Sequence, residues 1–279
     1  MDYKCNKKEI LNEIRGIIFD LDGVLWTGKK VIPGAVKFIN QLNRTNIKIR
    51  FISNTSSRSH EKTLKKMKDF GFKVKARQII VASKEISIFL SNKLHTSGNI
   101  YVIGTDDLKS EIKNSGLNLI SEEDLGNKKA DYVVAGFDKN FSYKKMRTAL
   151  KFFEQGAGFA AVNLDITAPS SDGLIPAAGS IVKCIEALAG GEIDIMIGKP
   201  EPYLLNKGIK SMQLSAKECI MVGDTPEADV KAARNAGLKS ILVLSGNFSK
   251  SSINKISGAK KPDLIINSIS DLNELLEER

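Results

Sequence analysis

The chain has 279 residues, of which 42% are hydrophobic and 27% are charged, and its net charge is +10. These proportions are ordinary for a globular protein, and no apolar run reaches the roughly 20 residues that a membrane-spanning helix needs. With two histidines a multi-histidine metal site is excluded, and three scattered cysteines argue against a disulfide framework. The N-terminal stretch has no uninterrupted apolar core of signal-peptide length. We therefore expect a cytoplasmic protein with no membrane partner.

The positive charge by itself suggests a nucleic-acid partner. The lysines, however, are spread along the chain in pairs such as Lys65–Lys66 and Lys144–Lys145, without a long basic block. Such a distribution is typical of a solvated surface, so we expect no nucleic-acid partner. A positive field would also draw anionic substrates toward a cleft.

Short apolar runs rich in isoleucine and valine recur along the whole chain, each bounded by turn residues. They predict strands over 17–20, 47–54, 100–104, 132–138, 159–163, 193–199, 219–224, 240–246 and 264–267. Because the runs are continuous rather than alternating, we expect strands buried on both faces, as in parallel sheets. Helix-period segments lie between them, at 34–44, 60–70, 142–156, 179–190 and 228–237. This alternation predicts an α/β architecture with parallel sheets.

Four of the predicted strands end in a polar residue that can do chemistry. These residues are Asp20, Ser53, Lys199 and Asp224. Ligands of open parallel sheets bind outside the carboxyl ends of the strands, so the fold would bring these side chains to one edge. Carboxylates can hold Mg2+, a lysine can neutralise phosphoryl oxygens, and an aspartate can attack phosphorus. The set therefore indicates phosphoryl transfer.

The segments around these four residues resemble, in the same order, the four motifs of the haloacid dehalogenase (HAD) superfamily. They are DLDGVLW at 20–26, ISNTSSRS at 52–59, GKPEP at 198–202 and GDTPEADV at 223–230. The long interval between the second and third motifs resembles the insertion of a type C2 cap domain, as in the NagD and p-nitrophenyl phosphatase branch. Within it, VVAGFDKNFSYKKM (133–146) and AVNLDITAPSSDGLIPAAGSIV (161–182) resemble segments of that branch.

The resemblance implies a doubly wound, parallel-sheet core built from residues 1–80 and 182–279, with an α/β cap inserted at 81–181. It also implies Mg2+-dependent hydrolysis of small phosphorylated metabolites through an aspartyl-phosphate. Sugar phosphates, phosphoglycolate, nucleotides and the artificial p-nitrophenyl phosphate all stay open as substrates. A homodimer formed through the cap would fit the resemblance.

The first two motifs carry most of the implied chemistry. The resemblance makes Asp20 the nucleophile and a Mg2+ ligand. Asp22 becomes the general acid and base, with its backbone carbonyl on the metal. Ser53 would donate a hydrogen bond to the phosphoryl group, with help from the backbone around Asn54 and Thr55.

The later motifs supply charge. Lys199 would pair with the phosphate and with the nucleophile, and Asp224 would be the principal metal-binding carboxylate. Asp229 would either bind the metal or support the site; Ala228 precedes it where relatives often have threonine, which leaves a supporting hydrogen bond in doubt.

In the cap, loop 163–173 would face the leaving group, with Asn163 and Asp165 as candidate contacts. Relatives that act on pyridoxal phosphate carry a histidine in this loop where this chain has Ala168, which weakens that substrate assignment.

Two alternatives to a phosphatase stay open on the same fold. One is a phosphotransferase, which would protect its phosphoenzyme from water. The other is a non-catalytic protein that binds a phosphate ligand, although Asp20, Asp22 and Lys199 argue against it.

Three further residues have no role in the motifs. We expect Trp26 to pack in the core, and Cys184 and Cys219 to be buried, inert thiols.

Overall fold

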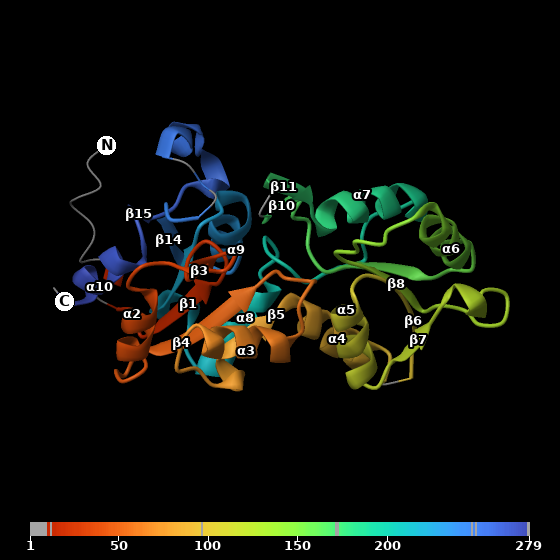
Figure 1. Ribbon diagram of the computed structural model, residues 1–279, viewed down its shortest axis with the longest axis horizontal. Coiled ribbons are helices and arrows are strands. Elements are labelled where there is room, and N and C mark those ends of the chain that lie inside the picture. Colours follow the sequence, from red (N-terminus) through yellow and green to blue (C-terminus); the bar gives the residue numbers. More distant parts are fainter. Residues whose placement is uncertain are drawn as a thin grey trace. The chain divides into compact units, whose positions relative to one another are not determined.

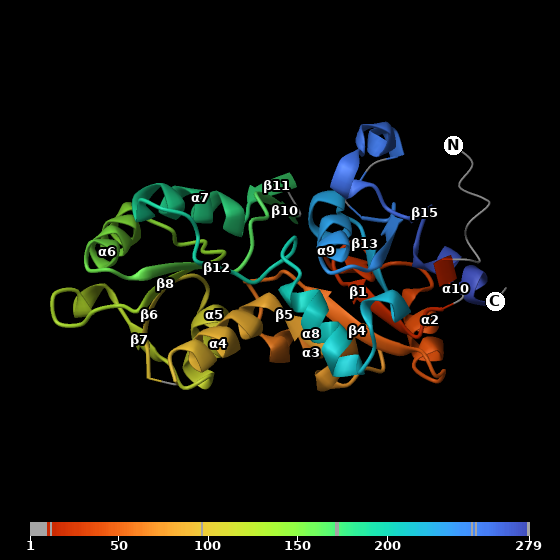
Figure 2. The same cartoon turned by 180° about the vertical axis from the view of Figure 1, so that it is seen from behind.

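The computed structural model describes residues 10–277 except residues 12, 96, 171, 172, 247 and 249. The chain divides into two compact units, each made of chain segments that are far apart in the sequence (Figures 1 and 2). Unit 1 comprises Met1–Ser53, Leu64–Ile80 and Lys199–Arg279, and unit 2 comprises Asn54–Thr63 and Val81–Gly198.

Unit 1 is built on a six-stranded sheet with the order β15-β14-β13-β1-β4-β5 (Figure 1). In that order the strands span Leu264–Ile266, Lys239–Val243, Cys219–Gly223, Gly16–Asp20, Lys48–Ser53 and Ile79–Val81. The central strand β1 pairs in parallel with β13 and with β4, and β13, β14 and β15 are also parallel to one another. Every residue of β1 and of β13 is buried, which explains why both strands are continuous apolar runs.

The helices that lie wholly in unit 1 each bury apolar residues. They are α2 (Ala35–Leu42), α8 (Tyr203–Met212), α9 (Lys231–Asn235) and α10 (Ile269–Glu277). In α2 the buried residues follow the helical period: Ala35, Phe38, Ile39 and Leu42. Helix α8 packs against β1 and β4, α9 against β14, and α10 against α2 and β15. A small antiparallel hairpin of β2 (Trp26–Thr27) and β3 (Lys30–Val31) follows β1.

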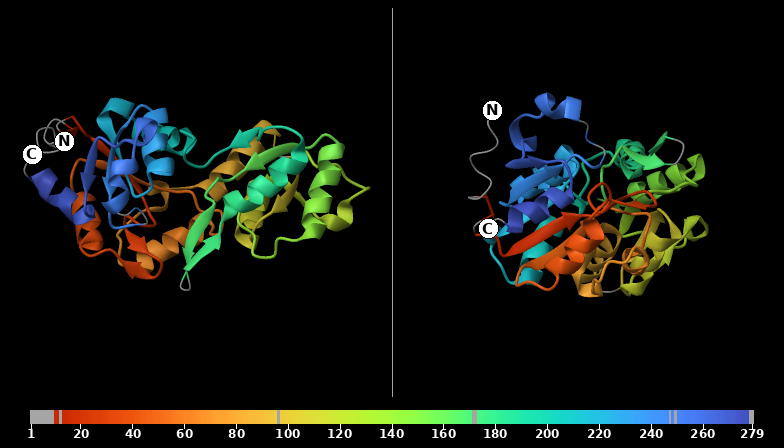
Figure 3. Two further views of the ribbon diagram at one scale, coloured as in Figure 1. Left: turned by 90° about the horizontal axis from the view of Figure 1, so that it is seen from above. Right: turned by 60° about the vertical axis from the view of Figure 1, so that its left-hand side comes forward.

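Unit 2 is built on a second, five-stranded sheet with the order β12-β9-β8-β6-β7. Its strands, in that order, span Ile195–Met196, Gly158–Ala161, Tyr132–Ala135, Asn99–Ile103 and Asn118–Ile120. All neighbouring pairs are parallel. Helices α4 (Ala82–Lys93) and α5 (Asp106–Asn114) cover one face, and α6 (Tyr143–Glu154) and α7 (Ala178–Ala189) cover the other (Figure 2). Strands β10 (Thr167–Ser170) and β11 (Gly173–Pro176) form a separate antiparallel hairpin (Figure 3).

The remaining helical elements are short, apart from α3. Helix α3 (His60–Asp69) contributes its first turn to unit 2 and the rest to unit 1. The 3-10 turns span Ala76–Gln78, Glu122–Asp124, Ala216–Glu218, Lys250–Lys255 and Gly258–Lys260, and Pro226–Val230 forms a π-helical turn. In the described part of the chain, none of the helices has both the length and the apolar character needed to span a membrane.

The predicted fold class, an α/β core with an inserted α/β unit, is confirmed. Both main sheets are parallel, and the segments of unit 2 interrupt the sequence of unit 1. All predicted strands are present, although the strand predicted over 193–199 is only Ile195–Met196. Strands β5 and β7 and both hairpins were not predicted. Cys219 is buried as expected, but the expectation for Cys184 was wrong, because it lies on the exposed face of α7.

The boundaries between the two units differ from the predicted domain boundaries at 80/81 and 181/182. Residues 54–63 and 182–198 belong to unit 2. The reason is that α7 packs against β8 and β9, and β12 pairs with β9. A boundary at 181/182 would cut through α7.

Candidate active site

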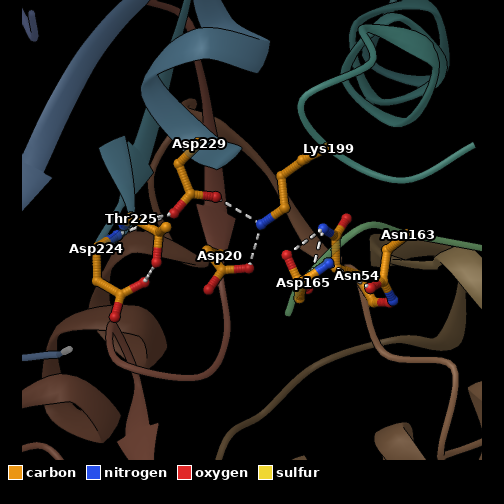
Figure 4. A network of polar contacts seen from close by, with 8 residues as sticks. All are labelled: Asp20, Asn54, Asn163, Asp165, Lys199, Asp224, Thr225 and Asp229. Atoms are coloured by element: carbon orange, nitrogen blue, oxygen red, sulfur yellow. Dashed lines mark hydrogen bonds and ion pairs between the residues drawn. The ribbon is translucent and has the colours of Figure 1, made fainter. Parts of the chain in front are cut away.

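Three carboxylates of unit 1 gather where β1 and β13 end (Figure 4). Asp20 is the last residue of β1, Asp224 directly follows β13, and Asp229 lies in the π-helical turn. All three residues are buried, and one carboxylate oxygen of each lies within 4.8 Å of the others. Because β1 and β13 are adjacent and parallel, their carboxyl ends meet at one sheet edge. Oxygen donors grouped in this way suit a hard cation such as Mg2+.

Lys199 joins two of these carboxylates (Figure 4). Its Nζ lies 2.5 Å from Asp20 Oδ1 and 2.5 Å from Asp229 Oδ1, and the residue is only 3% exposed. Burial disfavours the charged ammonium, but the two carboxylates outweigh that effect and raise the pKa of Lys199. The lysine therefore stays charged inside the site.

The charge balance around Asp20 is unfavourable for an ionised carboxylate. Burial raises the pKa of Asp20 well above its usual range; Lys199 opposes this, and Asp229 and Asp224 add to it. A cation among these oxygens would relieve the repulsion. Perturbed acids of this kind are concentrated at functional sites.

Asp224 is held by groups that the sequence analysis did not identify. Thr225 Oγ1 donates a hydrogen bond of 2.9 Å to Asp224 Oδ1. A Cβ atom at Gly23 or at Gly246 would collide with Asp224 Oδ2, so both positions need glycine. Gly23 also has φ +88°, in the left-handed region. Ser245 Oγ donates a 2.8 Å hydrogen bond to the Gly23 carbonyl, which connects the segment after β14 to this loop.

Asp229 already has protein donors at both of its carboxylate oxygens. Oδ1 accepts from Lys199, and Oδ2 accepts from the backbone N–H groups of Asp224 and Thr225, each at 3.0 Å. A Cβ atom at Gly223 would collide with this carboxylate, so Gly223 makes room for it. These donors fix the Asp229 side chain without a hydroxyl at position 228.

Asp22 lies in the turn after β1, where its side chain is 46% exposed. The indole Nε1–H of Trp26 donates a 2.7 Å hydrogen bond to Asp22 Oδ1. Trp26 is fully buried and packs against Phe70 and Phe72, as expected.

Ser53 is the last residue of β4, the strand that pairs with β1 on the side opposite β13. Asp20 pairs with Ile52, so Ser53 lies one residue further along β4, and it is buried.

The remaining predicted residues form a network within unit 2 (Figure 4). Asn163 is 3% exposed; its Nδ2 donates to the Asn54 carbonyl at 2.7 Å, and its Oδ1 accepts from the Asp165 backbone N–H at 3.0 Å. Asn54 Nδ2 lies 3.3 Å from Asp165 Oδ2. Asn163 thus holds the backbone at Asn54, a role that the sequence did not suggest. Thr55 is half-buried and its hydroxyl lies 3.1 Å from that of Ser57; residues 171 and 172 of the predicted cap loop lie outside the described residues.

Comparisons with known proteins identify the family. A family model described as haloacid dehalogenase-like hydrolase matches residues 17–118, and one described as HAD-hydrolase-like matches residues 196–272. The sugar-phosphatase AraL of Bacillus subtilis is 30% identical over 263 residues, which cover 94% of this chain and 93% of AraL.

Two solved structures of similar fold are also phosphatases. The p-nitrophenyl phosphatase from Archaeoglobus fulgidus is 29% identical with a TM-score of 0.86, covering 94% of this chain and 98% of its own. A glycerol phosphate phosphatase from Mycobacterium tuberculosis, solved in complex with magnesium, is 25% identical with a TM-score of 0.83, covering 95% of this chain and 78% of its own. The chain therefore belongs to the haloacid dehalogenase-like hydrolases, and it is an enzyme of their phosphatase type.

Proposed function

We propose that the protein hydrolyses small phosphomonoesters, sugar phosphates among them, in a Mg2+-dependent reaction through a phosphorylated Asp20. The observation that carries this proposal is the group of three buried carboxylates at one sheet edge, joined by a buried, charged lysine. The named activities of the relatives, on sugar phosphates, p-nitrophenyl phosphate and glycerol phosphate, support small phosphomonoesters as the substrate class.

The donor set fits a divalent cation, because its three acids repel one another and offer only oxygen ligands. Asp20, Asp224 and the backbone carbonyl of Asp22 would hold Mg2+. When bound, the ion supplies positive charge that neutralises the phosphoryl oxygens. Asp229 acts as a support rather than a ligand in this proposal, since its oxygens hold Lys199 and two backbone amides.

The protein groups then divide the reaction into two displacements. An oxygen of Asp20 attacks phosphorus, and the bond from phosphorus to the leaving oxygen breaks while Asp22 gives that oxygen a proton. In the second displacement Asp22 takes a proton from water, whose oxygen attacks phosphorus and releases Asp20 with inorganic phosphate. Lys199 and the Ser53 hydroxyl compensate the charge on the phosphoryl oxygens in both, with the backbone at Asn54 and Thr55 assisting.

Unit 2 is the C2-type cap in this proposal, and the loop that begins at Asn163 contacts the leaving group. Asp165 is the candidate for that contact. Asn163 instead keeps the phosphate-binding backbone at Asn54 in place, because both ends of its amide are engaged with the protein.

The test is p-nitrophenyl phosphate turnover with and without Mg2+, followed by a panel of sugar phosphates. Asp20→Asn should abolish turnover, whereas Asp69→Asn, a matched change at an exposed carboxylate paired with Lys65, should not. Trapping of labelled phosphate on the wild type but not on Asp20→Asn would identify the nucleophile. Transfer of phosphate to an added alcohol in preference to water would favour a phosphotransferase, and inactivity of folded, Mg2+-loaded wild type on the whole panel would overturn the proposal.

A further inference from the structure

The structure assigns a positioning role to Trp26 and Lys66: we propose that they orient the carboxylate of Asp22 toward the leaving oxygen of the substrate. This inference rests on the proposed function, in which Asp22 exchanges the proton. Neither residue belongs to the motif positions with an implied role. Both contact the same carboxylate oxygen, Oδ1 of Asp22.

Trp26 is a rigid donor. Its side chain is fully buried, with its ring centroid 5.6 Å from that of Phe70 and 6.2 Å from that of Phe72. Its own carbonyl accepts a 2.7 Å hydrogen bond from the Gly23 backbone N–H, which closes the turn that directly follows Asp22. The indole N–H therefore meets Asp22 Oδ1, at 2.7 Å, from a fixed position. The indole N–H can donate to Oδ1 whether or not the carboxyl group carries a proton on its other oxygen.

Lys66 reaches the same place from helix α3. Its Nζ lies 4.5 Å from the centroid of the Trp26 ring and 5.5 Å from that of Phe70, and it donates a 3.1 Å hydrogen bond to the Gly28 carbonyl. These contacts leave the side chain 20% exposed and place the ammonium 3.8 Å from Asp22 Oδ1. The ammonium thus packs on the indole that holds Asp22 and adds attraction to the same oxygen.

The need for such contacts follows from the exposure of Asp22. The Asp22 side chain is 46% exposed, whereas proton transfer requires its carboxyl group within hydrogen-bond reach of the reacting oxygen. An exposed ion pair alone contributes little, so we expect the buried indole to contribute more orientation than the ammonium does. The buried indole N–H of Trp26 needs a hydrogen-bond acceptor. Its acceptor is Asp22, the residue that exchanges the proton in the proposed reaction.

The test uses substrates that differ in their need for a general acid. The leaving group of p-nitrophenyl phosphate departs as a stable anion, whereas an alkoxide from glycerol phosphate or a sugar phosphate must be protonated. The quantity to compare is kcat/KM, because it reports only the steps up to formation of the phosphoenzyme. Trp26→Phe, which keeps an aromatic side chain but removes the N–H, should lower kcat/KM for the alkyl ester by about ten-fold and leave that for p-nitrophenyl phosphate nearly unchanged.

Lys66 provides an independent variant at a site that does not form the core. Lys66→Met should show the same selectivity with a smaller amplitude, and Lys66→Arg should restore the wild-type ratio of the two kcat/KM values. Lys65→Met is the matched control, since Lys65 is an exposed neighbour that pairs with Asp69. An equal loss on both substrates, or no loss in any variant, would overturn the inference.

Asp22→Asn separates this inference from the proposed function. If Asp22→Asn discriminates strongly between the two substrates but Trp26→Phe and Lys66→Met do not, the positioning role is wrong and the proton-transfer role of Asp22 stands. If Asp22→Asn itself loses both activities equally, the general-acid role fails, and the positioning role fails with it. Combining Trp26→Phe with Asp22→Asn should add no further selectivity to that of Asp22→Asn.

Discussion

Asp229 anchors Lys199 by a buried ion pair, with 2.5 Å between Oδ1 and Nζ, while its Oδ2 binds the backbone that carries Asp224. One carboxylate therefore fixes both the lysine that meets Asp20 and the loop that presents Asp224. The arrangement explains why an acid is needed at this position even without contact to a metal.

Asp229→Asn should consequently lower kcat without a large change in the Mg2+ requirement. We expect a loss of about ten-fold or more in turnover, because the amide no longer balances the charge of Lys199. The measurement is p-nitrophenyl phosphate turnover as a function of Mg2+ concentration, with Asp224→Asn alongside. If Asp229→Asn raises the half-saturating Mg2+ concentration as much as Asp224→Asn does, Asp229 is a direct ligand.

Thr225→Val should weaken Mg2+ binding, because it removes the 2.9 Å hydrogen bond to Asp224 Oδ1 while keeping the side-chain volume. Groups that orient a metal ligand typically contribute about 10- to 100-fold to metal affinity. Titration calorimetry with Mg2+ would measure this, and Thr225→Ser, which keeps the hydroxyl, should bind like wild type. Equal affinities for the valine and serine variants would rule out this role of the hydroxyl.

Gly23→Ala should damage the site more than Gly28→Ala, although both residues have positive φ, +88° and +59°. The backbone penalty, about 1–2 kcal/mol for a residue with Cβ, is common to both. Only at Gly23 would the added methyl collide with Asp224, since nothing lies within 4 Å of a Cβ at Gly28. Thermal unfolding should show a loss for both variants, and the Mg2+ requirement should rise for Gly23→Ala alone. A normal Mg2+ requirement in Gly23→Ala would mean that Asp224 can move aside without consequence.

Asp20→Asn should stabilise the fold in EDTA while it removes activity. The folded-state pKa of Asp20 is raised above 3.8, first by burial. The stability that this group contributes is therefore fully present below that value and is lost as pH rises through the folded-state pKa. At about pH 8 in EDTA we expect a higher Tm for the variant, by roughly 2–4 °C for each kcal/mol, with the difference vanishing at about pH 4.

Added Mg2+ should reverse the order of stability, because the ion compensates the wild-type carboxylates. The measurement is thermal unfolding across pH, with and without Mg2+. A variant in EDTA that is less stable than wild type at every pH would show that the ion pair with Lys199 outweighs the burial of Asp20.

The two described cysteines should differ sharply in reactivity. Burial raises the pKa of Cys219 to about 11, and the nearby Glu218 adds to this, whereas Cys184 is exposed. In a Cys5→Ser background, iodoacetamide should alkylate Cys184 in the native protein and Cys219 only after unfolding. Mass spectrometry of the peptides would distinguish the two, and rapid native labelling of Cys219 would contradict its burial in β13.

The sequence alone determined the fold class and the positions of Asp20, Ser53 and Asp224 at strand ends. The strand-end reasoning was wrong for Lys199, because β12 ends at Met196 and belongs to the other sheet. Strands buried on both faces require continuous apolar runs, and parallel strands bring their carboxyl ends to one edge. The positions of Asp20, Ser53 and Asp224 therefore follow from the sequence pattern.

The tertiary structure decided which groups these residues contact. The Thr225 hydroxyl donates a hydrogen bond to Asp224, and the Trp26 indole donates one to Asp22. The Asn163 side chain donates one to the Asn54 carbonyl. It likewise placed Cys184 on the exposed face of α7 and Gly246 against Asp224. Periodicity and strand ends are local properties of the chain, whereas hydrogen-bond partners and steric gaps depend on how distant segments pack, and no spacing in the sequence encodes that directly.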